Sequence, residues 1–433
     1  MTNNTSLIIN ESHHLDGEIH IPGDKSITHR ALILGVLSCG QLRIINTLLS
    51  EDCKKTINAL SLLGADISMD DSVITINGKG LDSLVQPSDI IDAGNSGTLA
   101  RLLSGILAVQ NFDSSITGDE SLIKRPMKRI IEPLMTAGAN ITSENNRLPI
   151  SFITSSVQPI NHISSIPSAQ VKSCLILASL FIDGESHISE LVTTRDHTER
   201  MLQYLDYPLS IDNNKIIISG KQNIVAKDIT IPSDISSAAF FIVAALIKKD
   251  SNIILKSIGI NPLRTGIIDV LIKMGADIKI TNNTSVCNEP VADIIVKSSI
   301  LKPIDLSGDI IPSLIDELPI LFIACACCDG TSTIRDIEEL RHKESDRIKA
   351  MEEGLKRLGI KVESTSNSIS ISGGLFNGGI INSFSDHRIA MSFIIAGLVS
   401  VKPITVLDTE NINTSFPNFI EILKDQNNEI YNL

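Results

Sequence analysis

Apolar positions along the chain follow a pattern that recurs four times clearly and once in a degraded form. A stretch of helical length ends at a glycine, and a run of alternating polar and apolar residues follows it. Clear copies end at Gly64, Gly138, Gly275 and Gly359, and a degraded copy lies at Tyr204–Leu209. Glycine at this position is typical of a helix C-cap, because it adopts the left-handed conformation without strain. Alternation with a period of two predicts a strand, so we expect an α/β protein.

Polar residues recur where the apolar helices are expected to begin. Six positions, spaced 66 to 82 residues apart, mark these starts: Lys25, Gly97, Ser168, Asp234, Asp316 and His387. The spacing predicts six βα-type units of similar size. Free N–H groups and the macrodipole at a helix start attract anions. Several such starts would suit a substrate with more than one negative charge, and a duplicated scaffold without chemistry is the alternative interpretation.

Composition limits the class of partner. The 433 residues are enough for two or three domains. The net charge of −13 argues against nucleic acid or a membrane surface as a partner, and the apolar runs are too short for a membrane span. Seven irregularly spaced cysteines predict free thiols in a reducing cytoplasm. Cys325, Cys327 and Cys328 lie in an apolar run, so we expect buried core thiols and no metal site.

Cationic motifs in the first half of the chain are candidates for anion binding. Lys25 begins the first helix, and Ser26 and Arg30 share one face of it. The glycines of Gly94–Thr98 would let backbone N–H groups approach an anion. The run Lys124–Arg129 contains four cations, among them arginines suited to bidentate contact with carboxylate or phosphate. Solvated helix starts and salt-bridged arginines are the structural alternatives.

Charged motifs also interrupt the second half of the chain. Asp316–Pro319 begins an apolar helix, Arg341–Arg347 is dense in charge, and Asp386–Arg388 separates two apolar stretches. Acidic residues at a helix start complement its dipole, and charged runs are often only solvated faces. In the first half of the chain, His197 lies in the charged turn RDHTER and is either a general base or, more commonly, a surface residue.

Taken in order, these motifs resemble the 5-enolpyruvylshikimate-3-phosphate (EPSP) synthase family. Each motif alone is weak evidence, whereas the ordered set is specific and extends from about residue 13 to residue 420. In this chain the set reads GDKSITHR, GNSGTLAR, RPM, SAQVK, RDHTER, PSDISSAA, DELP, KESDR, DHR and SFP.

The resemblance implies an α/β (α+β) fold known as a two-domain inside-out α/β barrel. Six βαβαββ repeats would be divided three per domain. The first domain would span residues 23–232, and the second would join residues 1–22 with 233–433. The chain would cross between domains near Pro22 and Ile231–Ser233, and the active site would lie in the interdomain cleft.

The resemblance also implies a reaction. The enolpyruvyl group of phosphoenolpyruvate would move to the 5-hydroxyl of shikimate 3-phosphate, with release of phosphate. This is a shikimate-pathway step toward chorismate and the aromatic amino acids, and it needs no cofactor and no metal. These two small molecules are the expected partners, the expected state is a cytoplasmic monomer, and glyphosate is the phosphoenolpyruvate-like inhibitor of the family.

Site residues carry over from the matched motifs. Asp316 would be the base for the 5-hydroxyl, Glu344 would carry the proton to the methylene carbon, and Lys25 would assist phosphate departure. Shikimate 3-phosphate contacts are implied for Lys25, Ser26, Arg30, Ser168, Ala169, Gln170, Arg195, Asp316 and Lys343. Phosphoenolpyruvate contacts are implied for Lys25, Asn95, Gly97, Arg125, Gln170, Arg347 and Arg388. Thr98 and Arg101 would shape the glycine-rich loop.

The chain departs from the family pattern in two places. Many members have a lysine just before Thr-Phe-Pro near the C-terminus, where this chain reads Asn413–Pro417. Lys172 is the candidate substitute for that cation. Asn261–Arg264 reads NPLR where the less glyphosate-sensitive subclass has NPTR. Gly97 keeps the small residue associated with sensitivity, so tolerance is not predicted.

Two other functions compete with this interpretation. An enolpyruvyl transferase acting on UDP-N-acetylglucosamine would normally have a Lys-Asn pair near the first helix and a loop cysteine. This chain has Lys25-Ser26 instead, and no cysteine lies between Cys53 and Cys174. A non-catalytic anion-binding scaffold would be expected to lose a proton-transfer carboxylate, and this chain keeps both.

Overall fold

The computed structural model describes residues 5–70, 73–426 and 428–432, and these divide into two compact units. The 23–231 unit comprises Gly23–Ile231 and the short segment Ser285–Glu289. The terminal unit comprises the described residues up to Pro22, Pro232–Thr284 and those from Pro290 onward. The domain limits expected at residues 1 and 433 lie outside the described residues.

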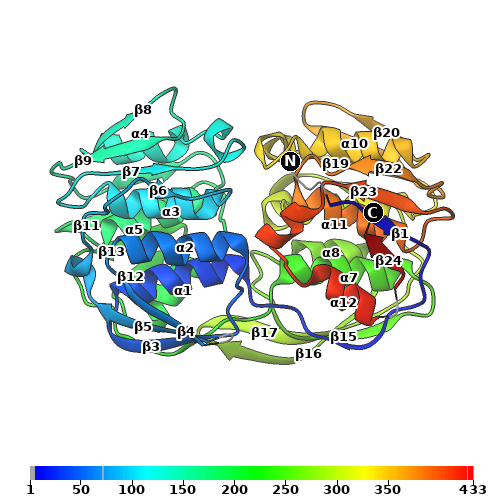
Figure 1. Ribbon diagram of the computed structural model, residues 1–433, viewed down its shortest axis with the longest axis horizontal. Coiled ribbons are helices and arrows are strands. Elements are labelled where there is room, and N and C mark those ends of the chain that lie inside the picture. Colours follow the sequence, from blue (N-terminus) through cyan, green and yellow to red (C-terminus); the bar gives the residue numbers. More distant parts are fainter. Residues whose placement is uncertain (1–4, 71–72, 427, 433) are drawn as a thin grey trace. The chain divides into compact units, whose positions relative to one another are not determined.

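One β-α-β-α-β-β repeat builds both units (Figure 1). A complete copy in the 23–231 unit consists of β6 (Ile91–Asp92), α3 (Gly97–Leu107), β7 (Ser114–Thr117), α4 (Lys128–Thr136), β8 (Asn140–Ser143) and β9 (Ile150–Ile153). Its sheet has the order β6-β7-β9-β8. The first pair is parallel and the other two pairs are antiparallel.

Two further repeats complete the 23–231 unit. One contains β10 (Asn161–Ser164), α5 (Ala169–Ser179), β11 (Glu185–Glu190), α6 (His197–Tyr204), β12 (Leu209–Asp212) and β13 (Lys215–Ser219). The other contains α1 (Lys25–Leu37), β3 (Cys39–Ile45), α2 (Glu51–Leu62), β4 (Asp66–Asp70), β5 (Val73–Lys79) and, from the far end of the unit, β14 (Ile229–Thr230). Because β14 pairs with β3, the last strand of this unit completes its first sheet.

The terminal unit has three sheets of the same kind. The first repeat contains β2 (Asp16–Ile19), α7 (Ile235–Ile247), β15 (Asn252–Gly259), α8 (Gly266–Lys273), β16 (Asp277–Val286) and β17 (Glu289–Lys297). The second contains β18 (Asp305–Leu306), α9 (Leu318–Ala326), β19 (Thr331–Arg335), α10 (Arg347–Arg357), β20 (Lys361–Ser364) and β21 (Ser368–Ser372). The third contains β22 (Gly379–Asn382), α11 (His387–Gly397), β23 (Ile404–Leu407), α12 (Phe419–Asp425), β24 (Ile430–Asn432) and the N-terminal strand β1 (Leu7–Ile9). In this last sheet β1 lies between β23 and β24.

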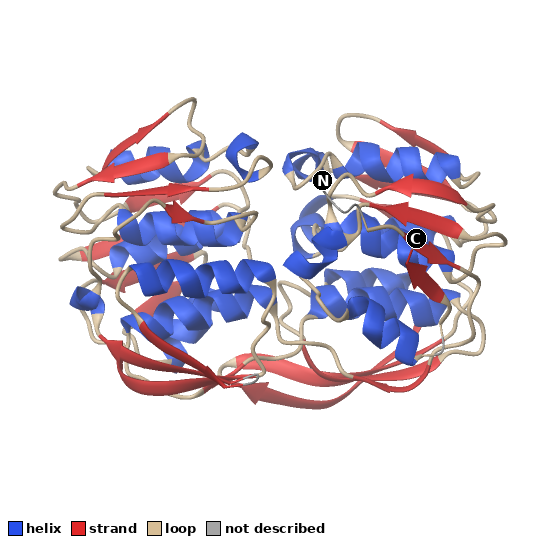
Figure 2. Cartoon of the chain, in the orientation of Figure 1, coloured by secondary structure: helices blue, strands red, loops and turns tan. Residues whose placement is uncertain are grey.

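Helices occupy the interior of each unit, and sheets lie outside them (Figure 2). In α1 every residue from Ile27 to Leu37 is buried, and α7 is buried from Ile235 to Leu246. A helix that is buried on all sides must be apolar all round, which explains why these segments carry their polar residues only at their starts. The six four-stranded sheets among the described residues confirm the predicted fold class and its six repeats.

The predicted helix boundaries are confirmed in most repeats. Gly64 has φ of 87° just after α2, as a C-cap residue in the left-handed region. In the degraded copy, Asp206 takes the place of glycine with φ of 57°. The helix expected at Asp316 begins two residues later, at Leu318. Asp316 itself therefore lies in the connection before the helix.

A short hairpin tip is shared between the units in an unexpected way. Strands β16 and β17 belong to a sheet of the terminal unit, whereas Ser285–Glu289 at their turn belongs to the 23–231 unit. Glu289 pairs with His197 at 2.7 Å, and Arg200 donates to the carbonyl of Asn288 at 3.0 Å. His197 is thus neither a surface residue nor a free base, since this buried hydrogen bond holds it at the start of α6.

Aromatic packing explains the SFP motif. Phe416 and Phe419 contact each other and pack with Phe240 and Phe241 of α7, with ring centroids 5.4 to 6.0 Å apart. The motif therefore anchors the segment before α12 in the core. Cys325 and Cys328 are buried as predicted. No helix in the described part of the chain is long and apolar enough to cross a membrane.

Candidate active site

The first helix start of the 23–231 unit presents a lysine beside a carboxylate. Asp24 caps α1 by accepting from the backbone N–H of Ile27 at 2.8 Å. Lys25 and Ser26 follow in the first turn, partly exposed, and the Nζ of Lys25 lies 3.1 Å from Asp52 of α2. This lysine is held in place while remaining accessible, as an anion ligand must be.

Arg30 lies one turn further along α1 and is buried. Its guanidinium donates to the hydroxyls of Thr198 at 2.8 Å and Ser173 at 2.7 Å, and to the backbone carbonyl of Ser26 at 2.9 Å. These hydrogen bonds join the starts of α1, α5 and α6. His29 is buried beside Arg30, and burial together with the nearby cations lowers its pKa to about 3, so its imidazole is neutral.

The glycine-rich loop before α3 gathers three of the predicted phosphoenolpyruvate ligands. Arg125 donates to the side-chain carbonyl of Asn95 at 2.7 Å. A Cβ placed on Gly97 would lie 3.1 Å from Arg101 and 3.3 Å from Arg125. Two guanidinium groups therefore approach this position so closely that a larger residue would displace them. Asp119 fixes Asn95 from the other side, at 2.7 Å.

Gln170 connects this loop to the start of α5. Its side-chain carbonyl accepts from Arg101 at 2.6 Å, and its amide donates to Thr98 at 3.1 Å. Ser168 caps the helix and Ala169 is its first residue. The predicted loop-shaping role of Thr98 and Arg101 fits these contacts, since both hold Gln170.

Lys172 does not have the position expected of a substitute for the missing C-terminal lysine ligand. Its side chain is 2% exposed and pairs with Glu190 and Glu199, each at 2.8 Å. Sequence shows the charge of such a lysine but not its burial. Arg195, by contrast, is partly exposed in the loop between β11 and α6.

The terminal unit brings its predicted site residues together around Arg347. This buried guanidinium lies 2.5 Å from Glu344 and 3.7 Å from Asp316. Lys343 pairs with Asp316 at 3.2 Å. Arg388 donates to the backbone carbonyl of Asp316 at 2.6 Å. Two candidate proton-transfer carboxylates thus lie within one cationic cluster.

Two buried carboxylates that support this cluster were missed in the sequence. Asp386 caps α11 and binds Arg347 at 2.8 Å. Burial opposes the charge on Arg347, but Asp386 and Glu344 outweigh it and hold the pKa of the guanidinium above its ordinary value. Glu317 lies 3.5 Å from Arg388 and accepts from the hydroxyl of Ser236. Both residues adjoin predicted ligands in DELP and DHR, which is the signal that could have identified them.

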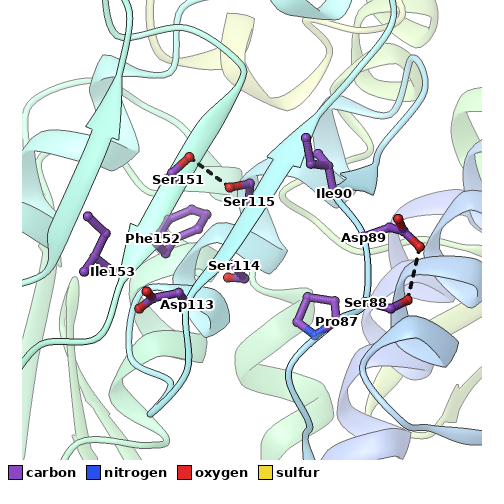
Figure 3. A pocket seen from close by; sticks show the side chains of 10 residues that line it. All are labelled: Pro87, Ser88, Asp89, Ile90, Asp113, Ser114, Ser115, Ser151, Phe152 and Ile153. Carbon is purple, nitrogen blue, oxygen red and sulfur yellow. Dashed lines mark hydrogen bonds between the residues drawn. The ribbon is translucent and has the colours of Figure 1, made fainter.

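A groove elsewhere in the 23–231 unit does not fit the predicted chemistry. It has a volume of about 530 Å³ and lies beside β7 and β9 (Figure 3). Asp89 and Asp113 line it, and negative side chains are unsuited to anionic substrates. The predicted site residues, all within the described chain, are not among those lining it. The described residues also contain no cluster of three or more His, Cys, Asp or Glu that could hold a metal ion.

Comparisons with known proteins identify the family of this chain. The family model for EPSP synthase (3-phosphoshikimate 1-carboxyvinyltransferase) matches residues 9–423. A 3-phosphoshikimate 1-carboxyvinyltransferase of Legionella pneumophila (strain Lens) is 48% identical over 408 residues, 94% of each chain. A protein of the same name from Coxiella burnetii (strain CbuK_Q154) is 46% identical over 417 residues, 96% of this chain and 95% of the relative. A solved EPSP synthase from Acinetobacter baumannii superimposes with a TM-score of 0.89 at 42% identity and covers 100% of both chains. The chain therefore belongs to the EPSP synthase family.

Proposed function

We propose that this protein transfers the enolpyruvyl group of phosphoenolpyruvate to the 5-hydroxyl of shikimate 3-phosphate, yielding EPSP and phosphate. The observation that carries the proposal is the cluster of Asp316 and Glu344 around Arg347, with Lys343 and Arg388 beside them. The reaction needs proton transfer next to bound anions, and this cluster offers both kinds of group. The reaction belongs to the shikimate pathway, which leads to chorismate and the aromatic amino acids.

Proton transfer in two stages explains the carboxylates. In the first stage the methylene carbon of phosphoenolpyruvate gains a proton, and the 5-hydroxyl adds to its C2 and loses a proton. In the second stage phosphate leaves, and the new methyl group loses a proton to regenerate the double bond. Asp316 would accept the hydroxyl proton, Glu344 would deliver and recover the proton at the methylene carbon, and Lys25 would assist the departing phosphate.

Exchange of the partner of Arg347 explains how Glu344 could take part in these proton transfers. In the structure Glu344 and Arg347 are paired at 2.5 Å. The carboxylate of phosphoenolpyruvate would compete with Glu344 for the same guanidinium, since both are carboxylates that can form charge-assisted hydrogen bonds with arginine. Its binding would release Glu344 for proton transfer. Asp386 would keep Arg347 in position during the exchange, because its contact of 2.8 Å is on the Nε side.

Both units would supply ligands to the substrates. Shikimate 3-phosphate would be held by Lys25, Ser26, Arg30, Ser168, Ala169, Gln170, Arg195, Asp316 and Lys343. Phosphoenolpyruvate would be held by Lys25, Asn95, Gly97, Arg125, Gln170, Arg347 and Arg388. Glyphosate would compete for the second set. We further propose that the protein acts as a monomer in the cytoplasm, without a cofactor.

Phosphate release tests the proposal directly. Purified protein with phosphoenolpyruvate and shikimate 3-phosphate should release phosphate continuously, and omission of either substrate should abolish the release. UDP-N-acetylglucosamine in place of shikimate 3-phosphate should give none. Absence of release from folded protein would overturn the proposal, and release with the nucleotide sugar alone would favour the other transferase.

Variants of the two carboxylates should lower turnover much more than they weaken the binding of shikimate 3-phosphate. Asp316→Asn and Glu344→Gln should each lower kcat by at least about a hundredfold, the usual contribution of a general acid or base. Affinity for shikimate 3-phosphate, measured by calorimetry, should change far less. Glu363→Gln is the control, because this carboxylate of the terminal unit is 78% exposed. Near-normal turnover in either site variant would show that its assigned role is wrong.

A further inference from the structure

Lys172 is an almost fully buried cation with a complete set of partners. Its Nζ lies 2.8 Å from Glu190 and 2.8 Å from Glu199, and it donates to the backbone carbonyl of Thr194 at 3.0 Å. An ammonium group has three N–H donors, so these acceptors satisfy it. The acceptors come from the end of β11, the loop after it and α6.

These contacts hold the loop that carries Arg195. Glu190, the last residue of β11, accepts from the backbone N–H of Thr194 at 3.2 Å and from its hydroxyl at 2.5 Å. Lys172 binds the carbonyl of the same residue. Thr194 is therefore fixed through both backbone groups and its side chain, and the backbone of Arg195 begins from a fixed point.

The neighbouring residues on the same two helices hold Arg30. Ser173 follows Lys172 on α5, and Thr198 precedes Glu199 on α6. The hydroxyls of Ser173 and Thr198 are 2.8 Å apart, and both accept from Arg30, at 2.7 and 2.8 Å. The ion pair of Lys172 with Glu199 therefore joins α5 to α6 at the level where Arg30 is bound.

Stability is a poor explanation for this buried charge. Buried ion pairs often contribute no more to stability than apolar residues of similar size, because desolvation offsets their attraction. Burial alone would lower the pKa of Lys172, but Glu199 and Glu190 outweigh it and raise the pKa above the ordinary value. Lys172 is therefore charged at neutral pH, and its effect on geometry is the more informative one.

We propose that Lys172 is a positioning residue that places Arg195 and Arg30 for shikimate 3-phosphate, and that it contacts neither substrate. The proposal rests on the function proposed above for those arginines. It assigns a different role to the lysine that the sequence had suggested as the substitute for the missing C-terminal cation. It also explains why a cation with no solvent access occurs within the SAQVK motif.

Steady-state kinetics of Lys172→Met separate this role from the alternatives. The KM for shikimate 3-phosphate should rise by about tenfold, as expected when a ligand is displaced by a fraction of an ångström. The KM for phosphoenolpyruvate should stay within about twofold of the wild-type value, because the arginines bound to Asn95 and Gln170 are unaffected. A rise confined to phosphoenolpyruvate, or no change in either KM, would overturn the proposal.

A second variant excludes an effect of stability. Lys172→Met leaves Glu199 buried without its cation, so we expect the melting temperature to fall. Lys172→Met with Glu199→Gln removes that charge and should recover much of the melting temperature. The raised KM for shikimate 3-phosphate should persist, because Thr194 still lacks its donor. If the double variant recovered both the melting temperature and the wild-type KM for shikimate 3-phosphate, the role of Lys172 would be merely structural. Lys221→Met, at a lysine that is 50% exposed, is the control.

Coupling to Arg195 completes the test. If Lys172 acts partly through Arg195, Lys172→Met should weaken shikimate 3-phosphate binding less in an Arg195→Gln protein than in the wild type, whereas independent effects would multiply. Multiplied effects would overturn the proposal. Hydrogen exchange of residues 191–196 gives a readout without substrate and should increase in the Lys172 variants. If the wild-type protein neither binds shikimate 3-phosphate nor releases phosphate, the proposed function fails, and the exchange still reports whether Lys172 holds the loop.

Discussion

The neutral imidazole of His29 shows how a single residue affects the charge at the start of a helix. The ring lies between Lys25 and Arg30 in the sequence, and its Nδ1 is 2.7 Å from the hydroxyl of Thr56. Burial lowers its pKa to about 3, with Lys25 and Arg30 adding to the effect. The start of α1 therefore offers the charges of lysine and arginine to an anion, without a third cation to repel them.

This buried imidazole should make stability depend on pH. In the unfolded chain histidine has a pKa near 6.5, so as the pH falls the unfolded state binds a proton that the folded state refuses. The free energy of unfolding therefore has its full contribution from the neutral His29 above about pH 6.5. This contribution is lost progressively as the pH falls toward about 3. Between pH 7 and 5.5 the loss should be about 1 kcal/mol.

His29→Gln should remove this part of the pH dependence. Urea unfolding of the wild-type protein and the variant, at pH 7 and pH 5.5, measures it. The variant should be less stable at pH 7, because the contact with Thr56 is altered, but its further loss at pH 5.5 should be smaller by about 1 kcal/mol. His20→Gln is the control, since that ring is 81% exposed. Equal losses in the two proteins would contradict the assignment.

Among single residues, the sequence motifs identified the charged side chains of the cluster around Arg347, but they did not identify the residues that support it. Arg347 and Arg388 were identified because they lie in motifs, and the structure gathers them near Asp316. Asp386 was missed because its partner Arg347 is 39 residues away and the residue looks like an ordinary cap. Lys172 was misjudged because charge is visible in a sequence and burial is not.

Among the helices, the contact between α3 and α5 shows what the repeat requires. A Cβ on Gly105 would lie 2.1 Å from the backbone carbonyl oxygen of Cys174. The two helix backbones approach so closely that only glycine fits. The same two helices carry Arg101 and Gln170, which are hydrogen-bonded at 2.6 Å. Close packing in the core therefore sets the geometry at the helix starts.

Gly105→Ala should be strongly destabilising. A backbone oxygen cannot move aside as a side-chain end can, so we expect a loss of about 3 kcal/mol and a clear fall in melting temperature. Gly35→Ala is the matched control in α1, because its Cβ would meet only the ends of Ile76 and Leu42, the nearest at 2.9 Å. Gly35→Ala should lower the free energy of unfolding by about 1 kcal/mol or less, since alanine favours the helix. Similar melting temperatures for the two variants would disprove the explanation.

Periodicity predicted these elements because each repeat has a local signal. An apolar helix with a polar start and a glycine end can be read within some twenty residues. Pairing between distant strands has no such signal, so neither the place of β1 beside β23 and β24 nor that of β14 beside β3 was predicted. The assignment of Ser285–Glu289 to the 23–231 unit was equally invisible, because it depends on contacts with His197 and Arg200.

At the scale of the molecule, each unit has its own hydrophobic core, and in each unit a strand distant in the sequence completes a sheet. In the terminal unit β1 contributes Leu7 and Ile9, which are 4% and 0% exposed. Both strands that flank β1 come from the last thirty or so residues of the chain. The net charge says little about the local distribution of charge, since a total of −13 coexists with cationic clusters at the helix starts.

Ile9→Ala should loosen one unit and spare the other. Truncation of a fully buried isoleucine costs about 3 kcal/mol, and the cost should fall on the sheet that β1 completes. Hydrogen exchange should increase in β23 and β24 and remain unchanged in β6, β7 and β9. Ile8→Ala, at the partly exposed position between the two buried residues, should have little effect. Equal increases in both units would show that their stabilities are not separate.

The position of β1 also bears on how a cell makes this protein. Leu7 leaves the ribosome long before Asn432, the residue that it pairs with in the sheet. The three sheets of the 23–231 unit have all their strands once β14 has been synthesised, whereas the sheet that contains β1 cannot be completed before β24 has been synthesised. Contacts across such a separation form slowly. During that delay the apolar strand β1 lacks both of its partner strands, so the nascent chain is prone to aggregation and is expected to bind chaperones.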